Sequence, residues 1–190
     1  MRTILFVLVP FIVATGTVNC QSGLNVGDKA PSIKALADDG STWNINKFLG
    51  RDYIVIYFYP AAMTGGCTRQ ACAYRDHQKD LQSADAVVVG ISGDKVENLR
   101  LFKESEKLNF TLLSDEKGEI AKAFGVPVSE GGTIKRTVFG DEHDLLRGVT
   151  AKRWTFIVGK DKKIIYKNEA VDAEKDTDEV MNFLKLQAQK

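Results

Sequence analysis

Two runs of apolar residues stand out near the middle of the chain. Tyr53–Tyr59 (YIVIYFY) and Ala86–Ser92 (AVVVGIS) are almost continuously apolar and rich in β-branched or aromatic side chains. Such runs are typical of strands buried on both faces of a sheet. Pro60 ends the first run, because proline has no N–H to donate to a strand ladder. We therefore expect two buried strands in one sheet.

Helical patterns separate and follow these strands. Thr68–Leu81 contains neither Gly nor Pro, and it is predicted to form one helix. Asp94 and Glu97 have the spacing of a capping pair at the start of a second helix. The pattern thus places one helix between the two buried strands and another after them.

Two further helices are predicted from their end signals. Ser114 is expected to cap a short helix that runs to Phe124 and ends at Gly125. Asp176 and Glu179 are expected to begin the last helix, with apolar residues on one face.

Four shorter segments have the character of paired strands. Ile33–Ala37 and Thr42–Ile45 predict a hairpin, and Trp154–Val158 and Lys163–Tyr166 predict a later antiparallel pair. Together with the buried strands and helices, this order predicts an α/β protein with a thioredoxin-like fold. Its central mixed β-sheet would be flanked by helices and extended by extra N-terminal strands.

The segment 126–152 fits neither pattern, since it mixes glycines, charges and one apolar spot. It predicts a hairpin or an ordered flap. We expect it to be either a solvated insertion or a lid or docking surface. His77 and His143 are expected to be surface residues rather than catalytic bases.

The N-terminus resembles an export signal. Residues 4–14 (ILFVLVPFIVA) are apolar but too short to span a bilayer comfortably. We predict a signal peptide over 1–19, a polar tether over 20–29 and one domain over 30–190; a buried N-terminal strand or helix is the alternative. Cys20 follows Thr17-Val18-Asn19, a weak lipoprotein pattern, and is either a lipidated residue or removed with the signal. The protein is therefore expected to be exported, as a periplasmic, lipid-anchored or secreted protein.

The charge balance limits the classes of partner. The chain has 26 Lys and Arg against 25 Asp and Glu, a formal charge of +1. The chain has no excess of basic residues that would favour binding to nucleic acid. Contact with a membrane is expected only through a lipid on Cys20.

The run Pro60-Ala61-Ala62-Met63-Thr64-Gly65-Gly66-Cys67 carries the chemistry. It places a thiol where a strand ends and a helix begins. The free N–H groups and partial positive charge of a helix N-terminus stabilise a thiolate, which is the nucleophilic form of cysteine. The Thr64 hydroxyl lies close enough in sequence to bind a substrate oxygen or the sulfur.

Cys72 supplies a second thiol five residues later. In a helix, this spacing gives a rise of about 7.5 Å and a turn of about 140°, whereas a disulfide needs Cα atoms about 4.4–6.8 Å apart. A bridge between Cys67 and Cys72 would therefore require the first helical turn to unwind. Two glycines, Gly65 and Gly66, would ease that change.

Other interpretations of this cysteine pair remain open. The two thiols could be inert buried residues or half of a zinc site, although structural zinc favours closer pairs and four ligands. In an exported protein they could also form a structural disulfide.

The flanking residues extend the pattern. Residues 57–76 (YFYPAAMTGGCTRQACAYRD), 90–116 and 153–164 resemble the corresponding segments of the peroxiredoxins, most closely the bacterioferritin-comigratory or PrxQ class. The Pro-x-x-x-Thr-x-x-Cys pattern is highly specific to that superfamily. The resemblance covers the chain from about Gly27 to its C-terminus. One departure is Gly65, where this class often has proline.

The resemblance implies a role for each matching residue. Cys67 matches the peroxidatic cysteine and Cys72 the resolving cysteine; Thr64 orients the peroxide, Pro60 shields the thiol from water, and Arg153 lies beside the thiolate. It further implies a thiol peroxidase for hydrogen peroxide or organic hydroperoxides, recycled by thioredoxin or a similar dithiol. No metal or organic cofactor is expected, and a monomer is expected.

Two rival functions have distinct signatures. A disulfide oxidoreductase on the same fold would normally have a closer Cys-x-x-Cys pair, and would leave Thr64 and Arg153 without a role. A non-enzymatic module would use a static disulfide for stability and would not react with peroxide.

Overall fold

A computed structural model describes residues 23–189 of the chain. The predicted signal peptide and Cys20 lie outside these residues. The described elements, in chain order, are β1 (Lys34–Leu36), β2 (Thr42–Asn44), a 3-10 turn η1 (Ile45–Lys47), β3 (Tyr53–Phe58), α1 (Gly65–Asp76), α2 (Gln78–Ser83), β4 (Ala86–Ser92), α3 (Val96–Glu106), β5 (Thr111–Ser114), α4 (Glu119–Phe124), β6 (Val128–Val138), β7 (Asp141–Ala151), β8 (Trp154–Val158), β9 (Ile164–Asn168) and α5 (Asp176–Gln187).

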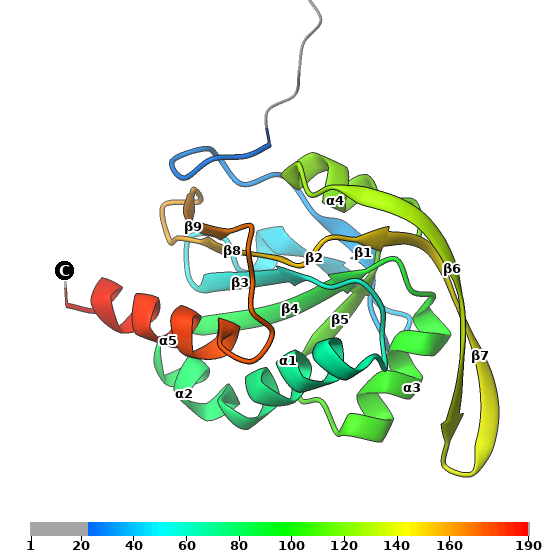
Figure 1. The fold of residues 1–190 in the computed structure, drawn as a ribbon. Coiled ribbons are helices and arrows are strands. Elements are labelled where there is room, and N and C mark those ends of the chain that lie inside the picture. Colours follow the sequence, from blue (N-terminus) through cyan, green and yellow to red (C-terminus); the bar gives the residue numbers. More distant parts are fainter. Residues whose placement is uncertain (1–22, 190) are drawn as a thin grey trace, which may run out of the picture.

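A five-stranded mixed sheet forms the centre of the molecule, in the order β5-β4-β3-β8-β9. β3 pairs in parallel with β4 and antiparallel with β8. One face packs against α1, α2, α3 and α5, and the opposite face packs against α4 and the β1–β2 hairpin (Figure 1). The predicted thioredoxin-like arrangement with an extra N-terminal hairpin is confirmed.

The first buried run is the middle strand of this sheet. Residues 54–58 of β3 have no more than traces of exposed surface, because strands lie on both sides and side chains cover both faces. Continuous apolar character is the expected sequence of such a strand. β3 therefore provides a rigid support for the loop that follows it.

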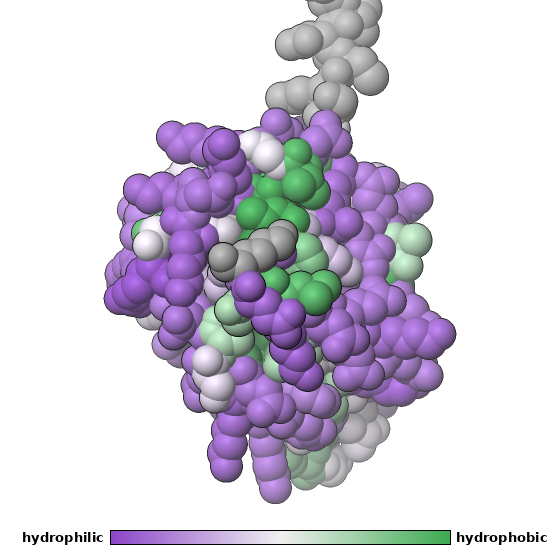
Figure 2. All heavy atoms as spheres, turned by 90° about the vertical axis from the view of Figure 1, so that its left-hand side faces the viewer, coloured by the Kyte–Doolittle hydropathy of each residue, from purple (hydrophilic) through white to green (hydrophobic). Residues whose placement is uncertain are grey.

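The outer edge of β9 is partly covered by the beginning of the described chain. The N–H of Gly27 donates to the carbonyl of Ile164 (2.8 Å), and the N–H of Ala30 donates to the carbonyl of Lys162 (3.0 Å). Such pairing blunts an edge that would otherwise be open to other strands. On this side of the molecule a small apolar area is surrounded by hydrophilic residues (Figure 2).

Segment 126–152 forms a long two-stranded hairpin, as one of its predicted alternatives proposed. β6 and β7 pair with each other and join no other sheet. The hairpin extends past α3, away from α5 (Figure 1). We call residues 128–151 the arm. The exposed side chain of Phe139 lies at its turn.

The predicted helix over 68–81 is wrong in its extent. Helix α1 begins earlier, at Gly65, and ends at Asp76, and α2 follows after a break at His77. Burial of Ala71 and Tyr74 against the sheet outweighs the small helical cost of the two glycines, about 1 kcal/mol each. The break redirects the chain so that Leu81 is also buried.

Two predicted caps are also wrong. Lys95, not Asp94, precedes α3, and the Asp94 side chain is buried elsewhere. The start of α4 is capped by Asp115, whose carboxylate accepts hydrogen bonds from the N–H groups of Ile120 and Ala121 (3.0 and 2.8 Å), rather than by Ser114. In both places the predicted capping side chain is engaged by a distant segment instead. The Asp94 carboxylate accepts from the N–H of Ala62, and the Ser114 hydroxyl donates to the carbonyl of Asp94 (2.8 Å). Gly125 ends α4 in a left-handed conformation, as predicted.

Candidate active site

Cys67 lies in the first turn of α1, directly beyond the carboxyl end of the central strand. Thr64 precedes the helix with an extended backbone, and Cys67 is its third residue. The residue is only 2% exposed, and it packs among side chains of one face of the sheet. The sequence correctly predicted this position, because both the end of the strand and the start of the helix are local signals.

Arg153 brings a positive charge to this thiol. It immediately precedes β8, whose first residue, Trp154, pairs with Phe58 at the end of β3. This register places the guanidinium beside the start of α1. Its Nη2 donates to the Cys67 sulfur at 3.3 Å. A fixed guanidinium at this distance favours negative charge on the sulfur and on oxygens next to it.

A buried chain of hydrogen bonds holds Arg153 from behind. Its Nη1 donates to Gln70 Oε1 (2.5 Å), and Gln70 Nε2 donates to Asp176 Oδ2 (2.7 Å). The same carboxylate oxygen accepts from Tyr74 (2.7 Å) and Thr155 (2.9 Å). Gln70 belongs to α1 and Asp176 to α5, and both elements are packed against the sheet. The hydrogen bonds therefore hold the Arg153 guanidinium in one preferred orientation.

Asp176 is the centre of this chain of hydrogen bonds and is completely buried. Burial raises the pKa of its carboxyl above the usual 3.8, while the three hydrogen bonds act in the opposite direction. Sequence reasoning missed its role and that of Gln70. The four-residue spacing of Gln70 and Tyr74 shows that they share a helix face, but nothing local links them to Asp176.

Thr64 and Pro60 lie in the loop that joins β3 to α1, and they make different contacts. The Thr64 hydroxyl donates to the carbonyl of Ala61 (2.9 Å). Pro60 and Arg153 line a hollow of about 340 Å³, whose other walls come from both ends of the arm. Arg153 thus contacts the Cys67 sulfur and also lines the hollow that Pro60 borders.

The loop between β3 and α1 is held by a second buried carboxylate that sequence reasoning had placed at a helix cap. Asp94 Oδ2 accepts hydrogen bonds from the N–H of Ala62 and from the Ser92 hydroxyl, both at 2.8 Å. Burial raises the pKa of Asp94. Its side chain fixes the backbone at Ala62, four residues after the strand ends.

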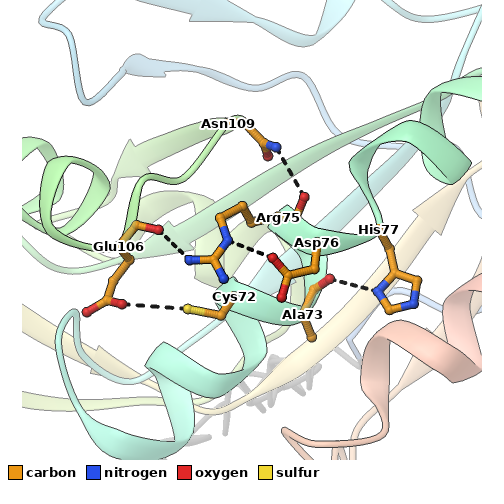
Figure 3. A network of polar contacts seen from close by, with 7 residues as sticks. All are labelled: Cys72, Ala73, Arg75, Asp76, His77, Glu106 and Asn109. Atoms are coloured by element: carbon orange, nitrogen blue, oxygen red, sulfur yellow. Dashed lines mark hydrogen bonds and ion pairs between the residues drawn. The ribbon is translucent and has the colours of Figure 1, made fainter.

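Cys72 lies five residues further along α1, close to Arg75 and Glu106 (Figure 3). Its sulfur is 3.7 Å from Glu106 Oε2, and Arg75 donates to the main-chain oxygen of Glu106 (2.5 Å). Burial raises the pKa of the Cys72 thiol; Arg75 opposes this rise and Glu106 adds to it. Cys67 and Cys72 are both free thiols on an intact helix.

Within residues 23–189, no three His, Cys, Asp or Glu side chains are placed to hold a metal ion together. His77 lies at the break between α1 and α2, with Nδ1 3.0 Å from the carbonyl of Ala73. His143 lies on the arm, in β7. No helix in this range is long and apolar enough to cross a membrane.

Comparisons with known proteins agree on one group. The chain matches the AhpC/TSA family over residues 26–167. It is 38% identical over 165 residues to Peroxiredoxin Bcp of Escherichia coli, covering 87% of this chain and 98% of that protein. It is 34% identical over 167 residues to Peroxiredoxin Bcp of Bacillus subtilis, covering 88% and 99%. The crystal structure of peroxidoxin BcpB from Mycobacterium tuberculosis superimposes with a TM-score of 0.71 at 30% identity, covering 86% and 97%.

Proposed function

Because this chain belongs to the AhpC/TSA family and is a peroxiredoxin of the Bcp/PrxQ class, we propose a catalytic cycle in which Cys67 attacks the peroxide and Cys72 resolves the product. The protein is a thiol peroxidase that reduces peroxides. The observation that carries the assignment of Cys67 is its 3.3 Å contact with the Arg153 guanidinium at the start of α1.

In the first step, the Cys67 thiolate attacks the terminal oxygen of a hydroperoxide. A sulfur–oxygen bond forms as the O–O bond breaks, so that sulfur loses two electrons and becomes a sulfenic acid. The other oxygen leaves with the electron pair and takes up a proton, giving water or an alcohol. Arg153 stabilises the charge as it moves from sulfur to oxygen.

Thr64 and Pro60 have supporting roles in this step. Rotation of the Thr64 hydroxyl away from the carbonyl of Ala61 would let it donate to a bound peroxide. Pro60 adds an apolar wall beside Arg153, which limits access of water to the sulfur.

In the second step, the sulfur of Cys72 attacks that of the Cys67 sulfenic acid. The disulfide forms, and the hydroxyl leaves as water with the proton of the Cys72 thiol. Because Cys72 bonds to Glu106 on a different side of α1, the first turns of the helix must unwind before the sulfurs can meet. The two glycines at the start of α1 lower the cost of that change.

The disulfide is then reduced by thiol exchange with a thioredoxin-like dithiol, which becomes oxidised in turn. We propose hydrogen peroxide and organic hydroperoxides as substrates, and a monomer as the working unit. Neither the oxidation of Cys67 nor the formation of the disulfide requires a metal or an organic cofactor. Residues 30–190 form the catalytic domain in this proposal.

The place of action is proposed from the N-terminal sequence. The apolar stretch 4–14 followed by polar residues supports export, with residues 1–19 as signal peptide and 20–29 as tether. The product would be periplasmic or secreted, or held at a membrane by a lipid on Cys20. Mass determination of the protein from its native membrane and soluble fractions tests this, because lipidation adds a defined mass to Cys20.

Intact mass with peptide mapping after one equivalent of hydrogen peroxide tests the cycle. We expect a loss of 2 hydrogens that maps to a Cys67–Cys72 bridge, about 2 Da. Cys67→Ser should abolish peroxide consumption. A sulfenic or over-oxidised Cys67 beside a free Cys72 would remove Cys72 as the resolving residue. Unchanged thiols would overturn the cycle and favour a static module.

A further inference from the structure

The arm reaches back to the active-site loop through one side chain. Exposure alternates along β6, so that Lys135 and Thr137 face solvent while Arg136 faces the body of the protein. Arg136 Nε donates to the main-chain oxygen of Met63 at 2.9 Å, and its Nη1 donates to the carbonyl of Lys135 at 2.7 Å. The guanidinium therefore connects the arm to the residue just before Thr64.

Met63 has a backbone conformation that needs support. Its φ is +58°, in the left-handed region that non-glycine residues rarely adopt. The next residue, Thr64, accepts the first hydrogen bond of α1 from the N–H of Thr68 (2.8 Å). A change at Met63 would therefore alter the start of the helix that carries Cys67.

We propose that Arg136 is a positioning residue that holds the loop 60–64 and the first turn of α1 in the conformation that reacts with peroxide. Its hydrogen bond to Met63 must break, or move with the loop, when the turn unwinds for disulfide formation. Arg136 therefore sets the balance between the folded turn, which reduces peroxide, and the unwound turn, which closes the disulfide. This inference rests on the proposed roles of Cys67 and Cys72.

The arm can act as a fixed support because it is anchored independently of Arg136. The N–H of Gly148 donates to the carbonyl of Gly93 (2.9 Å), and Asn98 Nδ2 donates to the carbonyl of Leu146 (2.7 Å). The backbones approach so closely that a Cβ atom on Gly93 would collide with the carbonyl of Val149. Removing the Arg136 side chain leaves these contacts in place.

This anchor lies next to the other support of the same loop. Gly93 precedes Asp94, whose carboxylate binds the N–H of Ala62. The loop is thus held at Ala62 from the end of β4 and at Met63 from the arm. The arm, which lies outside the central sheet, thereby becomes part of the catalytic apparatus.

The test compares Arg136→Ala with Lys135→Ala, its neighbour on the solvent face. Each reduced protein is mixed with hydrogen peroxide, stopped with acid at successive times, and analysed by mass for thiol, sulfenic acid, disulfide and sulfinic acid. Loss of a charged hydrogen bond is expected to make the disulfide step about tenfold faster in Arg136→Ala. The rate at which peroxide oxidises the Cys67 thiol should hardly change in Arg136→Ala, because the folded first turn of α1 still predominates.

Further readouts separate positioning from a general effect on folding. After excess peroxide, Arg136→Ala should accumulate less sulfinic acid than the wild type, and Arg136→Lys should fall between them. Lys135→Ala should match the wild type.

Equal disulfide rates in Arg136→Ala and Lys135→Ala, or slowing of both steps in Arg136→Ala, would overturn the inference. Should Arg136→Ala not fold, Arg136→Lys decides by the same criterion. If the wild-type cysteines do not react at all, the proposed cycle itself fails, which is a different result.

Discussion

Arg153 and Cys67 are separated by 86 positions in the sequence, yet their side chains meet at 3.3 Å. Two features produce this contact. The first is the strand–loop–helix unit that places Cys67 beyond β3, and the second is the antiparallel pairing of β8 with β3. The thiol thus receives its cationic partner from the neighbouring strand.

The first prediction concerns Arg153. Arg153→Met keeps most of the apolar bulk but removes the charge and both donors. We expect the rate of Cys67 oxidation by hydrogen peroxide to fall by about 100-fold or more, the usual effect of losing a donor to developing charge. Rapid mixing followed by mass analysis measures this rate. Lys152→Ala, an exposed neighbour, is the control, and a similar rate in Arg153→Met and in that control would contradict the assignment.

The second prediction concerns the support behind Arg153. In Asp176→Asn the amide oxygen can still accept from Gln70, Tyr74 and Thr155, but these bonds lose the help of a negative charge. The amide NH2 replaces Oδ1, which is buried without a hydrogen-bond partner among the described residues, so the free energy of unfolding should fall by about 1–3 kcal/mol. We also expect slower oxidation of Cys67, because the weakened bond between Gln70 and residue 176 fixes Arg153 less firmly. Chemical unfolding monitored by circular dichroism, together with the oxidation rate, tests both. Unchanged stability and rate would show that the buried network has no influence.

The same variant has a pH signature. The pKa of Asp176 is raised in the folded state mainly by burial, with Glu179 adding to the rise and hydrogen bonds opposing it. The folded state therefore binds this proton more tightly than the unfolded state. The stability that this proton contributes is fully present below about pH 3.8, the usual pKa of an aspartate. It is lost as the pH rises through the raised pKa of the folded state. Asp176→Asn should remove this decline from the stability profile, while the contribution of Asp94 remains.

A third prediction concerns the resolving thiol. Glu106→Gln removes a negative charge next to Cys72, so the pKa of Cys72 should fall. In a Cys67→Ser background, alkylation of Cys72 by iodoacetamide near pH 7.5 should become severalfold faster, since the thiolate is the reactive form. Glu104→Gln, on the exposed side of the same helix, is the matched control. If Glu106→Gln alkylates no faster than this control, the Glu106 carboxylate does not contribute to the raised pKa of the Cys72 thiol.

The fourth prediction separates the two cysteines. Cys72→Ser should leave the first oxidation of Cys67 nearly unchanged, because Cys72 does not contact the Arg153 site. Without a resolving thiol, the sulfenic acid should persist and proceed to sulfinic acid under excess peroxide. Peptide mapping of Cys67 gives the distribution of products. Rapid return of Cys72→Ser to the thiol form with a dithiol donor, without over-oxidation, would show that Cys72 is not required.

Local features of the sequence determined the site's centre. The apolar run of β3, the stop at Pro60 and the glycines before Cys67 act over a few residues, so their consequences could be predicted without the rest of the chain. The hairpin at 126–152 could also be predicted, although not its length or direction. The family resemblance, rather than periodicity, pointed to Arg153.

Tertiary structure decided which polar groups meet. Asp94, Asp176 and Gln70 have little local meaning, because the donors they bind come from distant elements. Buried carboxylates must find such partners, and this requirement overrode the capping role predicted for Asp94. Only the packing of the arm against the end of β4 places Arg136 over Met63. Residues near in sequence thus positioned the nucleophile, whereas long-range packing chose the groups that surround it.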